Sequence, residues 1–529
     1  MKKYKYKEYI ANVFPCLTYG IACGSVTGAV IFLFRLGAKY AEEISRHLYG
    51  VAKGSMLYVA AAFAVLIAFA LAMSFLHKKI PEVKGGGIPR SEGILRGILS
   101  LRPIMTFTGT VIGSMISFFC GLPLGSEGPA VLIGTSIGSM CGSVSKNQTA
   151  WNRYVMTGGA GAGFAVATGS PLSGILFALE EIHKRFTPML VLTVSVSVIS
   201  ATCVNRLLCS AFGISPSLFE IEKLAEFELS HIGYLLLLGV IIALAVAVFD
   251  GSISLHGKLI GRFSKFVPNT AKIIFIFVTT GILGFLFTDG IYSGHDVIHD
   301  LLTYDKTVIY LILLSVLRLA MMLLVTDSGV TGGIFIPTLA IGAVAGALAA
   351  KFLIAIGMPA ELFQTLLLLS MCAFIGGTLR APLTAAILFI ELTGQFTDLF
   401  YVALVIFTVN LVTGLLNQTP FYDHALDNII KADNKGREPM IDYFEMKVSD
   451  NAFVIGKAIR DVMWPNASAV ISITRANKSQ KDMDNDGEKK LYAGDTIVMR
   501  SRYYDESEIK KQLCGLVGSD YEIKKLDSE

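Results

Sequence analysis

The sequence predicts an all-α polytopic membrane domain with an internal repeat, followed by a small α+β domain outside the membrane. Three observations carry this prediction: the distribution of charge, the recurring apolar segments and an internal match without gaps. Of the 529 residues, 53% are apolar and 16% are charged, whereas a typical soluble chain has about 25% charged residues. The charge is also uneven, because 36 charged residues fall in the 105 residues 425–529 and 50 in the preceding 424.

The bulk composition excludes several classes of protein. The formal net charge of +4 is small for this length and indicates no polyanionic partner such as nucleic acid. The eight cysteines lie mostly within apolar stretches and form no C-x-x-C pair. We therefore expect buried small hydrophobic residues, with neither a metal site nor a disulfide framework. The low charge of the first 424 residues excludes an ordinary cytosolic enzyme.

Apolar segments that could cross or enter a bilayer recur along the first part of the chain. The continuous segments are 10–34, 56–76, 190–204, 232–249, 273–287, 308–325 and 400–416. Four others contain glycines and a proline: 125–142, 158–181, 332–348 and 373–391. A helix end in hydrocarbon leaves backbone groups unpaired, so interrupted segments survive only inside protein or around a polar site.

The N-terminal residues set the expected orientation. Residues 1–7 carry four lysines and precede a long apolar run, which resembles the start of a signal peptide. The length of the run and the lack of a cleavage pattern favour a first membrane helix. Lysines flanking such a helix hold that end in the cytoplasm.

The interrupted segments occur in pairs. Residues 171–180 (PLSGILFALE) match 382–391 (PLTAAILFIE) without a gap, and 129–134 (PAVLIG) match 337–342 (PTLAIG). The offsets are 211 and 208 residues, which indicates a duplication of about 200 residues. Chance recurrence among alanine, leucine and glycine is the alternative. Paired, interrupted segments are typical of the midplane binding site of a transporter.

Three glycine-rich stretches stand at expected helix starts: 85–89 (GGGIP), 125–129 (GSEGP) and 332–337 (GGIFIP). Proline is tolerated in the first turn of a helix, where its missing N–H has no intrahelical partner. A helix N-terminus offers free N–H groups and about half a positive charge. Several such ends converging at the midplane would bind a small anion without a basic side chain.

Basic side chains are absent around two of these stretches. No basic residue lies between Arg102 and Lys146 or between Arg318 and Lys351. Glu127 is a carboxylate within one of these glycine-lined segments, and an ionisable residue inside the membrane is by default a functional candidate. At a helix N-terminus this carboxylate would compete with the anion and leave on protonation, which makes it both a gate and a proton carrier. A helix N-cap without gating duty is the alternative.

These residues resemble the CLC family of chloride channels and transporters. The G-x-E-G-P, G-x-G-I-P and G-G-I-F-x-P stretches occur in the family's order and spacing, and the similarity covers roughly residues 10 to 426. The resemblance implies an antiparallel, that is inverted, duplicated helical fold and a homodimer with one pore per subunit. It also implies a chloride site built from helix N-termini, no other cofactor, and a place in the bacterial cell membrane with both termini cytoplasmic.

The resemblance also assigns roles by motif position. Glu127 matches the external gating glutamate, and Ile334 and Phe335 match the residues whose backbone amides contact the anion. Tyr422, in the stretch TPFY, matches the tyrosine whose hydroxyl donates to the central chloride from the intracellular side. The other motif positions shape the backbone; they are Gly85, Gly87, Pro89, Gly125, Gly128, Pro129, Gly333 and Pro337.

One motif position departs from the family. Gly86 stands where the family usually has a serine whose hydroxyl helps to coordinate the anion. Glycine removes this donor and keeps the backbone N–H, so chloride could bind through an added water. The preference among chloride, bromide and nitrate is therefore open, whereas the other motifs disfavour fluoride selectivity.

A second glutamate favours an antiporter. Family members that exchange chloride for protons commonly carry an intracellular proton-transfer glutamate at the position of Glu181, where channels usually have a residue that does not titrate. The alternative is that Glu181 is an interfacial carboxylate paired with Lys184 or Arg185, without a role in proton transfer. Glu180 is expected to be structural, because its repeat partner is Glu391.

The sequence thus predicts a chloride/proton antiporter, with a passive voltage- or proton-gated chloride channel as the alternative. An intramembrane enzyme is disfavoured, because no paired metal ligands or nucleophile and base are present.

The charged tail predicts a separate domain at residues 441–529, after a linker at 427–440. Strands are expected at 470–474 and 496–500 and helices at 455–463 and 505–513, the second with a capping box from Asp505 to Glu508. The tail departs from the CBS pair of eukaryotic CLC proteins. Three of its stretches, 453–460 (FVIGKAIR), 470–475 (VISITR) and 492–498 (YAGDTIV), resemble the RCK-C (TrkA-C) regulatory subdomain of ion transporters. Such subdomains dimerise, and some bind cyclic di-AMP. The residues expected to line that ligand are Ile471, Ile473, Arg475 and Asn477; a purely structural dimerisation module is the alternative.

Overall fold

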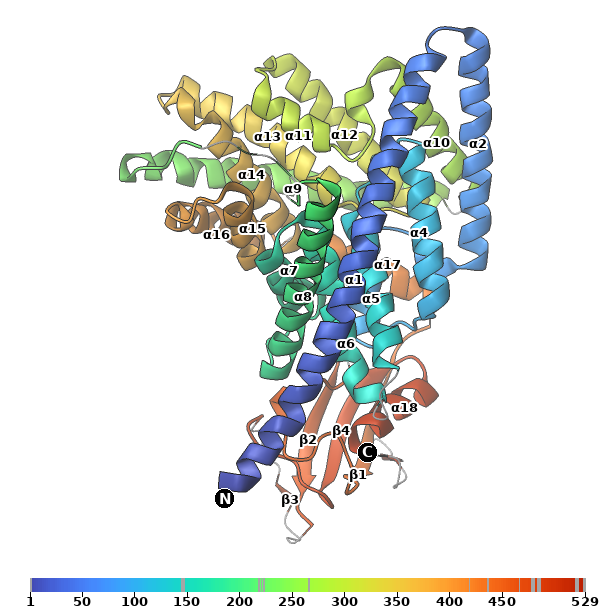
Figure 1. Ribbon diagram of the computed structural model, residues 1–529, viewed down its shortest axis with the longest axis vertical. Helices are drawn as coiled ribbons and strands as arrows, with labels where there is room; N and C mark the ends of the chain where they lie inside the picture. Colours follow the sequence, from blue (N-terminus) through green and yellow to red (C-terminus); the bar gives the residue numbers. More distant parts are fainter. Residues whose placement is uncertain are drawn as a thin grey trace.

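The computed structural model describes residues 2–143, 148–216, 219, 221, 224–264, 267–417, 419–434, 437–465, 467–476, 481–482, 487–518 and 523–526. A large helical body carries a small β-sheet domain at one end (Figure 1). The first helix begins beside this domain, so both ends of the chain lie at the same end of the molecule (Figure 1).

The helical body contains seventeen α-helices among the described residues. They are α1 Lys2–Ala52, α2 Met56–Lys79, α3 Ile88–Leu95, α4 Pro103–Phe119, α5 Glu127–Gly142, α6 Gln148–Thr168, α7 Pro171–Phe177, α8 Pro188–Phe212, α9 Ile232–Ser264, α10 Asn269–Leu286, α11 His295–Thr303, α12 Val308–Ser328, α13 Phe335–Ala355, α14 Phe363–Leu379, α15 Pro382–Thr393, α16 Leu399–Leu415 and α17 Phe421–Asp433. A π-helical turn, Ala178–Ile182, extends α7.

Eight helices of the described chain are long and apolar enough to cross a membrane. The seven continuous apolar segments predicted from the sequence lie in α1, α2, α8, α9, α10, α12 and α16. Many large apolar side chains on these helices are exposed, as expected of surfaces that face lipid. The chain is therefore a multi-pass membrane protein.

The interrupted segments form the interior of the body. Helices α5, α13 and α14 are buried over nearly their whole length. The internal match is reproduced in the structure, because Pro171 and Pro382 are the first residues of α7 and α15, and Pro129 and Pro337 are the third residues of α5 and α13. Equivalent residues of the two repeats thus begin equivalent helices.

The C-terminal domain is a five-stranded antiparallel sheet with one helix. The strands are β1 Met440–Lys447, β2 Ser468–Thr474, β3 Lys481–Asp482, β4 Thr496–Tyr503 and β5 Lys524–Leu526, in the order β3-β2-β4-β1-β5, and the helix is α18 Glu506–Val517. Both predicted strands and the second predicted helix are confirmed. The expected linker at 427–440 overlaps the end of α17 and the first residue of β1.

The helix predicted at 455–463 is wrong. The segment forms turns and one 3₁₀ turn, Ile459–Asp461. Gly456 has a φ of +77°, which is left-handed backbone that a helix interior does not accept. Ile455 and Ala458 instead form β-bridges with Leu491 and Lys490, so tertiary pairing overrides the helical pattern.

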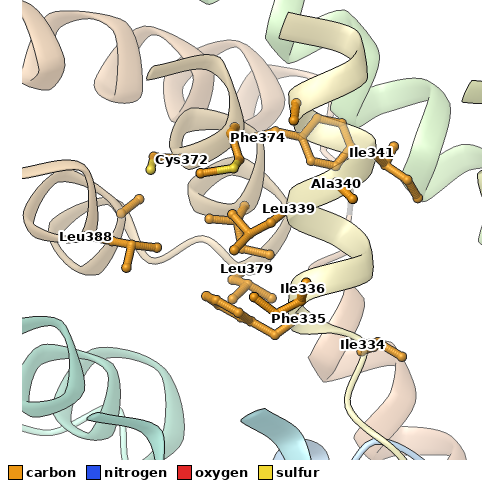
Figure 2. Packing of buried hydrophobic residues seen from close by; sticks show 14 of the residues in the cluster. Ile334, Phe335, Ile336, Leu339, Ala340, Ile341, Cys372, Phe374, Leu379 and Leu388 are labelled. Carbon is orange, nitrogen blue, oxygen red and sulfur yellow. The ribbon is translucent and has the colours of Figure 1, made fainter. Parts of the chain in front are cut away.

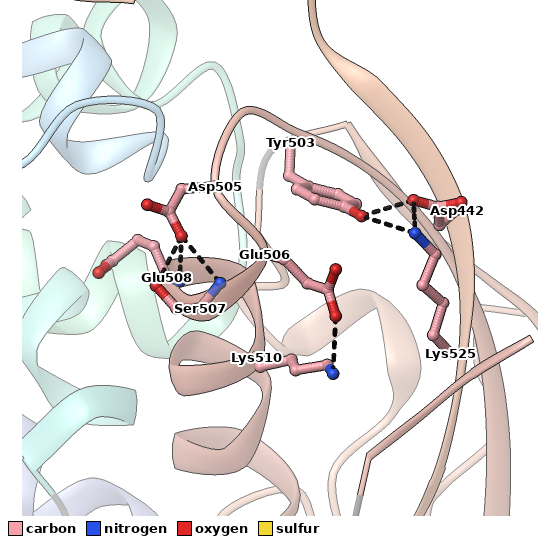
Figure 3. A network of polar contacts seen from close by, with 8 residues as sticks. All are labelled: Asp442, Tyr503, Asp505, Glu506, Ser507, Glu508, Lys510 and Lys525. Atoms are coloured by element: carbon pink, nitrogen blue, oxygen red, sulfur yellow. Dashed lines mark hydrogen bonds and ion pairs between the residues drawn. The ribbon is translucent and has the colours of Figure 1, made fainter.

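Polar side chains fix the ends of this domain (Figure 3). The Asp505 carboxylate accepts hydrogen bonds from the backbone N–H groups of Ser507 (2.8 Å) and Glu508 (3.2 Å), which caps α18. Across the sheet, Tyr503 donates to Asp442 (2.5 Å) and Lys525 pairs with the same carboxylate oxygen (2.9 Å). The short strand β5 is thereby tied to β1.

The domain is docked against the N-terminal end of α6 by polar contacts. Arg153 Nη1 donates to the carbonyl of Trp464 (3.3 Å), and its Nη2 contacts Gln512 Oε1. The Tyr154 hydroxyl donates to the carbonyl of Asp461 (2.9 Å). These contacts join a membrane helix to both the loops and the helix of the domain.

Aromatic packing closes the same interface. The Trp151 ring meets the Phe453 ring edge to face, with centroids 5.3 Å apart, and Tyr154 lies 6.1 Å from the same ring. Lys457 Nζ lies 3.9 Å from the Phe453 centroid and donates to the Phe453 carbonyl (2.5 Å). One buried apolar cluster consequently includes residues of α1, α5, α6 and the sheet.

The eight cysteines form no disulfide in the described chain, and five of them are buried, as the sequence predicts. Cys141 and Cys514 are half-buried, whereas Cys203 is exposed on α8 and so departs from the expectation of burial.

Candidate functional site

The three glycine-rich stretches meet through their backbones. Gly125 and Gly333 exchange two hydrogen bonds, from Gly125 N to Gly333 O (2.6 Å) and from Gly333 N to Gly125 O (2.7 Å). Gly85 N donates to Gly329 O at 3.0 Å, and Gly332 N donates to Gly85 O at 3.4 Å. Segments more than 200 residues apart in sequence are thus held at one place.

Glycine is required where these segments touch. A Cβ atom on Gly128 would lie 1.8 Å from the Gly86 carbonyl oxygen, and one on Gly87 would lie 2.4 Å from the Gly128 carbonyl oxygen. Gly87 also has a φ of +80°, a conformation that L side chains rarely adopt. Gly86 is different, because a Cβ there would meet its nearest atom at 3.6 Å.

Two long helices begin at this meeting point. Glu127 is the first residue of α5, and Phe335 is the first residue of α13, preceded by Ile334 at the N-cap. Figure 2 shows Ile334 on the chain that enters α13, and Phe335 and Ile336 in its first turn. The Phe335 ring packs edge to face against Phe164, with centroids 5.0 Å apart. The helix starts are therefore fixed by packing, with their first N–H groups at the glycine junction.

Glu127 is 2% exposed. Its Oε1 accepts a hydrogen bond from Ser126 Oγ at 3.1 Å. Its Oε2 is buried and has no hydrogen-bond partner in the described chain. A buried carboxylate oxygen without a donor is costly when charged, so this group is suited to exchange a proton or to leave its position.

Glu180 and Glu181 are adjacent in sequence and have different surroundings. The π-helical turn Ala178–Ile182 inserts an extra residue into the helix, which re-aims the side chains. Glu180 accepts hydrogen bonds from Leu383 N (3.1 Å) and Thr384 N (2.7 Å) at the start of α15. Glu181 is 2% exposed, and its Oε1 has no partner among the described residues.

Lys184, considered with Arg185 as a pairing partner of Glu181, forms its ion pairs with other carboxylates, although its charge also acts on Glu181. Its Nζ lies 3.2 Å from Glu92 and 2.6 Å from Asp423. Glu92 also pairs with Arg96 at 2.7 Å and is buried. Sequence reasoning missed Glu92, although a carboxylate seven residues after the first glycine of the stretch 85–89 was a usable signal.

Tyr422 is a third buried polar residue of the site. It is the second residue of α17, is 1% exposed, and its hydroxyl has no hydrogen-bond partner within the described ranges. Both Glu181 and Glu127 lie within electrostatic reach of its phenol. The structure thus brings together the predicted residues Glu127, Glu181 and Tyr422.

Two cavities are found in the described chain, and we call the one that the C-terminal domain lines the inner cavity and the other the outer cavity. The outer cavity, about 470 Å³, is lined by Glu127 and by charged residues of α1, among them Arg35. The inner cavity, about 1170 Å³, is lined by Lys184 and Asp423 from the body and by Tyr504 and Gln512 from the C-terminal domain. Sequence reasoning missed Arg35, an isolated basic residue at the end of the first apolar run.

The residues proposed to bind a nucleotide lie in the C-terminal domain. Ile471 is half-buried on β2, whereas Ile473 is buried in the core of the domain. Arg475 pairs with Asp495 at 2.5 Å and donates to the Lys490 carbonyl at 2.9 Å. Asn477 lies outside the described residues. No group of three or more potential metal ligands occurs in the described part of the chain.

Comparisons with known proteins match this geometry. The family model for the voltage gated chloride channel matches residues 65–414. The chain is 28% identical over 421 residues to the H(+)/Cl(-) exchange transporter ClcA of Salmonella paratyphi B and to the same transporter of Salmonella newport, covering 76% of this chain and 86% of each relative.

Solved structures show the same fold. A slow cyanobacterial Cl-/H+ antiporter superposes with a TM-score of 0.72 at 23% identity, covering 79% of this chain and 99% of that one. A eukaryotic CLC transporter superposes with a TM-score of 0.65 at 19% identity, covering 84% and 78%. The glycine junction, the two helix starts and the match over most of the membrane body all agree: this chain has the CLC fold and belongs to the CLC, or voltage gated chloride channel, family of transport proteins.

Proposed function

We propose that this protein exchanges chloride for protons across the bacterial cell membrane. One observation carries the proposal: two buried carboxylates, Glu127 and Glu181, each have an oxygen without a hydrogen-bond partner among the described residues, and the charges of both act on the buried Tyr422 phenol. A passive anion pore needs no second titratable group at Glu181. The exchange activity named for the Salmonella relatives supports the same function.

The helix starts supply the anion site in this proposal. Chloride is held by the backbone N–H groups at Ile334 and Phe335 and by the Tyr422 hydroxyl, with no basic side chain to trap it. Gly86 contributes only backbone, so a water completes the coordination shell. Glu127 competes with the anion for the same positive helix end.

The two glutamates then carry protons in opposite halves of the path. Glu127 faces the outer cavity and takes a proton when it leaves the helix start, which lets chloride enter. Glu181 exchanges protons with the cytosol, from the side on which the inner cavity opens beside Lys184. Because each proton movement requires the anion site to change occupancy, the two fluxes are coupled.

Flux measurements in proteoliposomes test this proposal directly. A chloride gradient should drive uphill proton movement, recorded with a pH electrode, in the wild-type protein. The Glu127→Gln and Glu181→Gln variants should lose proton movement, while Asp305→Asn, which removes an exposed carboxylate from the loop before α12, should keep it. Chloride flux without proton movement in the wild type would instead identify a channel.

We also propose that the protein is a homodimer with both termini in the cytoplasm. The N-terminal lysines and the charged C-terminal domain lie at one end of the molecule, as Figure 1 shows. Basic residues flanking a membrane helix favour the cytoplasmic side. Protease added to intact spheroplasts should leave the C-terminal domain uncut, and mass measurement in detergent should give twice the chain mass of 57.1 kDa.

The C-terminal domain is proposed to regulate transport as an RCK-C-like module. It contacts α6 through Arg153 and Tyr154 and forms one wall of the inner cavity. A ligand that moves the domain would therefore alter the entrance for ions. Cyclic di-AMP is the proposed ligand, with Ile471 and Arg475 as the described residues that reach the edge of β2.

Titration calorimetry on the full-length protein tests the nucleotide. Micromolar cyclic di-AMP should release heat with the wild type and less heat with Arg475→Ala. Binding requires Arg475 to exchange its contact with Asp495 for a phosphate. No heat at micromolar nucleotide would leave the domain as a structural module.

A further inference from the structure

The basic residues that line the outer cavity each lie within ion-pair distance of a carboxylate, with one exception among the described residues. Arg46 lies beside both Glu42 and Asp296, and Lys39 lies 3.9 Å from Glu43. Each of these cations therefore faces a carboxylate that cancels much of its field. Arg35 lines the same cavity, and its guanidinium has no carboxylate within ion-pair distance among the described residues.

Arg35 is held in place by a neutral partner. Its Nη1 donates to the carbonyl of Val166 at 2.9 Å, in the last turn of α6. A cation near a helix C-terminus is favoured by the helix dipole, but a backbone carbonyl does not neutralise its charge. Arg35 is half-buried, so water and salt screen it less than they screen the exposed Lys39.

Arg35 also stands next to the gate. Glu127 and Ser126 line the same cavity, and the charges of Arg35 and Glu127 act on each other across it. An anion that enters this cavity therefore meets, in the same lining as Glu127, one positive charge that forms no ion pair with a carboxylate among the described residues. Charges that line a cleft raise the local concentration of the opposite ion.

We propose that Arg35 is a positioning residue that draws external chloride to the outer face of the Glu127 gate. This inference rests on the proposed chloride transport, and it adds a residue from α1 to a site otherwise built from backbone. Arg35 does not join the central anion site, so its role is in outer binding and not in the exchange step. Loss of the Arg35 charge should therefore change the apparent affinity for chloride only on the face opposite the C-terminal domain.

The test compares two substitutions at Arg35. Arg35→Gln removes the charge and keeps an N–H donor for the Val166 carbonyl, whereas Arg35→Lys keeps the charge. Chloride uptake is measured against bath chloride in spheroplasts and in everted vesicles of a strain without other chloride transporters. Protease cleavage of the C-terminal domain reports which face is exposed.

Arg35→Gln should raise the half-saturating chloride concentration about threefold to tenfold in spheroplasts, as expected for loss of one charge at close range in a partly dry cavity. The maximal rate should change less than twofold, and everted vesicles should show the wild-type value. Arg35→Lys should stay near the wild type. Lys39→Gln is the matched control, because it removes the same charge one turn away on α1 from a side chain paired with Glu43, and it should have little effect.

Three results would overturn the inference. These are an unchanged half-saturation in Arg35→Gln, an equal rise on both faces, or an equal effect of Lys39→Gln. A fall in maximal rate alone, without a change in half-saturation, would make Arg35 a structural anchor of α6. In each case wild-type uptake still reports whether the proposed chloride transport holds, so the two failures are distinguishable.

Discussion

Glu180 and Glu391 each cap the start of a helix in the opposite repeat. Glu180, at the end of the first repeat's interrupted segment, accepts hydrogen bonds from Thr384 N and Thr384 Oγ1, both at 2.7 Å. Glu391, its equivalent in the second repeat, accepts from Ser173 N at 2.8 Å and Ser173 Oγ at 2.7 Å. The duplicated sequence thus produces a reciprocal pair of helix caps, as expected when two related halves pack face to face.

Substitution of either cap should cost stability to a similar extent. We expect Glu180→Gln and Glu391→Gln each to destabilise the body by about 1–2 kcal/mol, because a neutral amide accepts fewer and weaker hydrogen bonds than a carboxylate. Thermal unfolding in detergent measures this loss. Glu438→Gln, at an exposed position between α17 and β1, is the control. A loss confined to one of the two glutamates would contradict the reciprocal arrangement.

A serine at position 86 should be accepted and should strengthen anion binding. The nearest atom to an added Cβ is Ile334 Cγ1 at 3.6 Å, and the backbone at Gly86 is not left-handed. The new hydroxyl adds a donor beside the helix starts, so chloride affinity should rise several-fold, which corresponds to about 1 kcal/mol. Calorimetric titration with chloride measures the change.

Gly87→Ser is the matched control for this substitution. Its Cβ would lie 2.4 Å from the Gly128 carbonyl oxygen, so this variant should lower the melting temperature or fail to assemble. Equal tolerance at positions 86 and 87 would show that the glycine junction is looser than the structure indicates.

The docked domain should become more stable as the pH rises above 8. Burial lowers the pKa of Lys457 from 10.5 to about 8, so between these values the unfolded chain binds more protons than the folded one. Stability therefore increases with pH across this window, by on the order of 2–3 kcal/mol. Below pH 8, Lys457 is protonated in both the folded and the unfolded state, so the free-energy cost of burying its charge does not change with pH.

Lys457→Met should remove this pH dependence. The variant's melting temperature, compared with the wild type's at several values between pH 7.5 and 10.5, isolates the contribution of one lysine. Lys510→Met is the control, since Lys510 is partly exposed on α18 beside Glu506. Parallel curves for wild type and Lys457→Met would show that Lys457 is not the group responsible.

Loss of aromatic packing should release the C-terminal domain. Truncation of Trp151 to alanine removes the edge-to-face contact with Phe453 and should cost about 3 kcal/mol of docking energy. Limited proteolysis at residues 434–440 should accelerate, and chloride flux should change if the domain controls the inner entrance. Arg460→Ala, which breaks an exposed pair with Glu488, should leave both unchanged.

Much of the fold was predictable because hydrocarbon imposes strict rules on sequence. The long apolar runs in α2, α9 and α12 were typical of membrane helices, and the repeated Pro-Leu motif indicated the duplication, whose two prolines are the first residues of α7 and α15. The tail was less predictable, because Gly456 and long-range bridges to Leu491 replaced an apparent helix. Short soluble segments depend on partners far away in sequence, which local patterns do not encode.

The residues of the candidate site were also only partly predictable from the sequence. Glu127, Phe335 and Tyr422 carried their signals in local motifs. Arg35 carried none, because its importance comes from the missing carboxylate next to it and from a carbonyl on another helix. The packing of Trp151 onto Phe453 could not be predicted either, because it joins the membrane body to the C-terminal domain, which the composition shows only as two separate parts.

Helix α6 joins the two ends of the molecule as a single rod. Its first turns hold the C-terminal domain through Trp151, Arg153 and Tyr154, and its last turn offers the Val166 carbonyl to Arg35. With 21 residues, the rod is about 30 Å long. An axial shift imposed by the domain would therefore reach the outer anion entrance with no intermediate hinge, so a cytosolic signal could tune how the protein samples chloride on the opposite face.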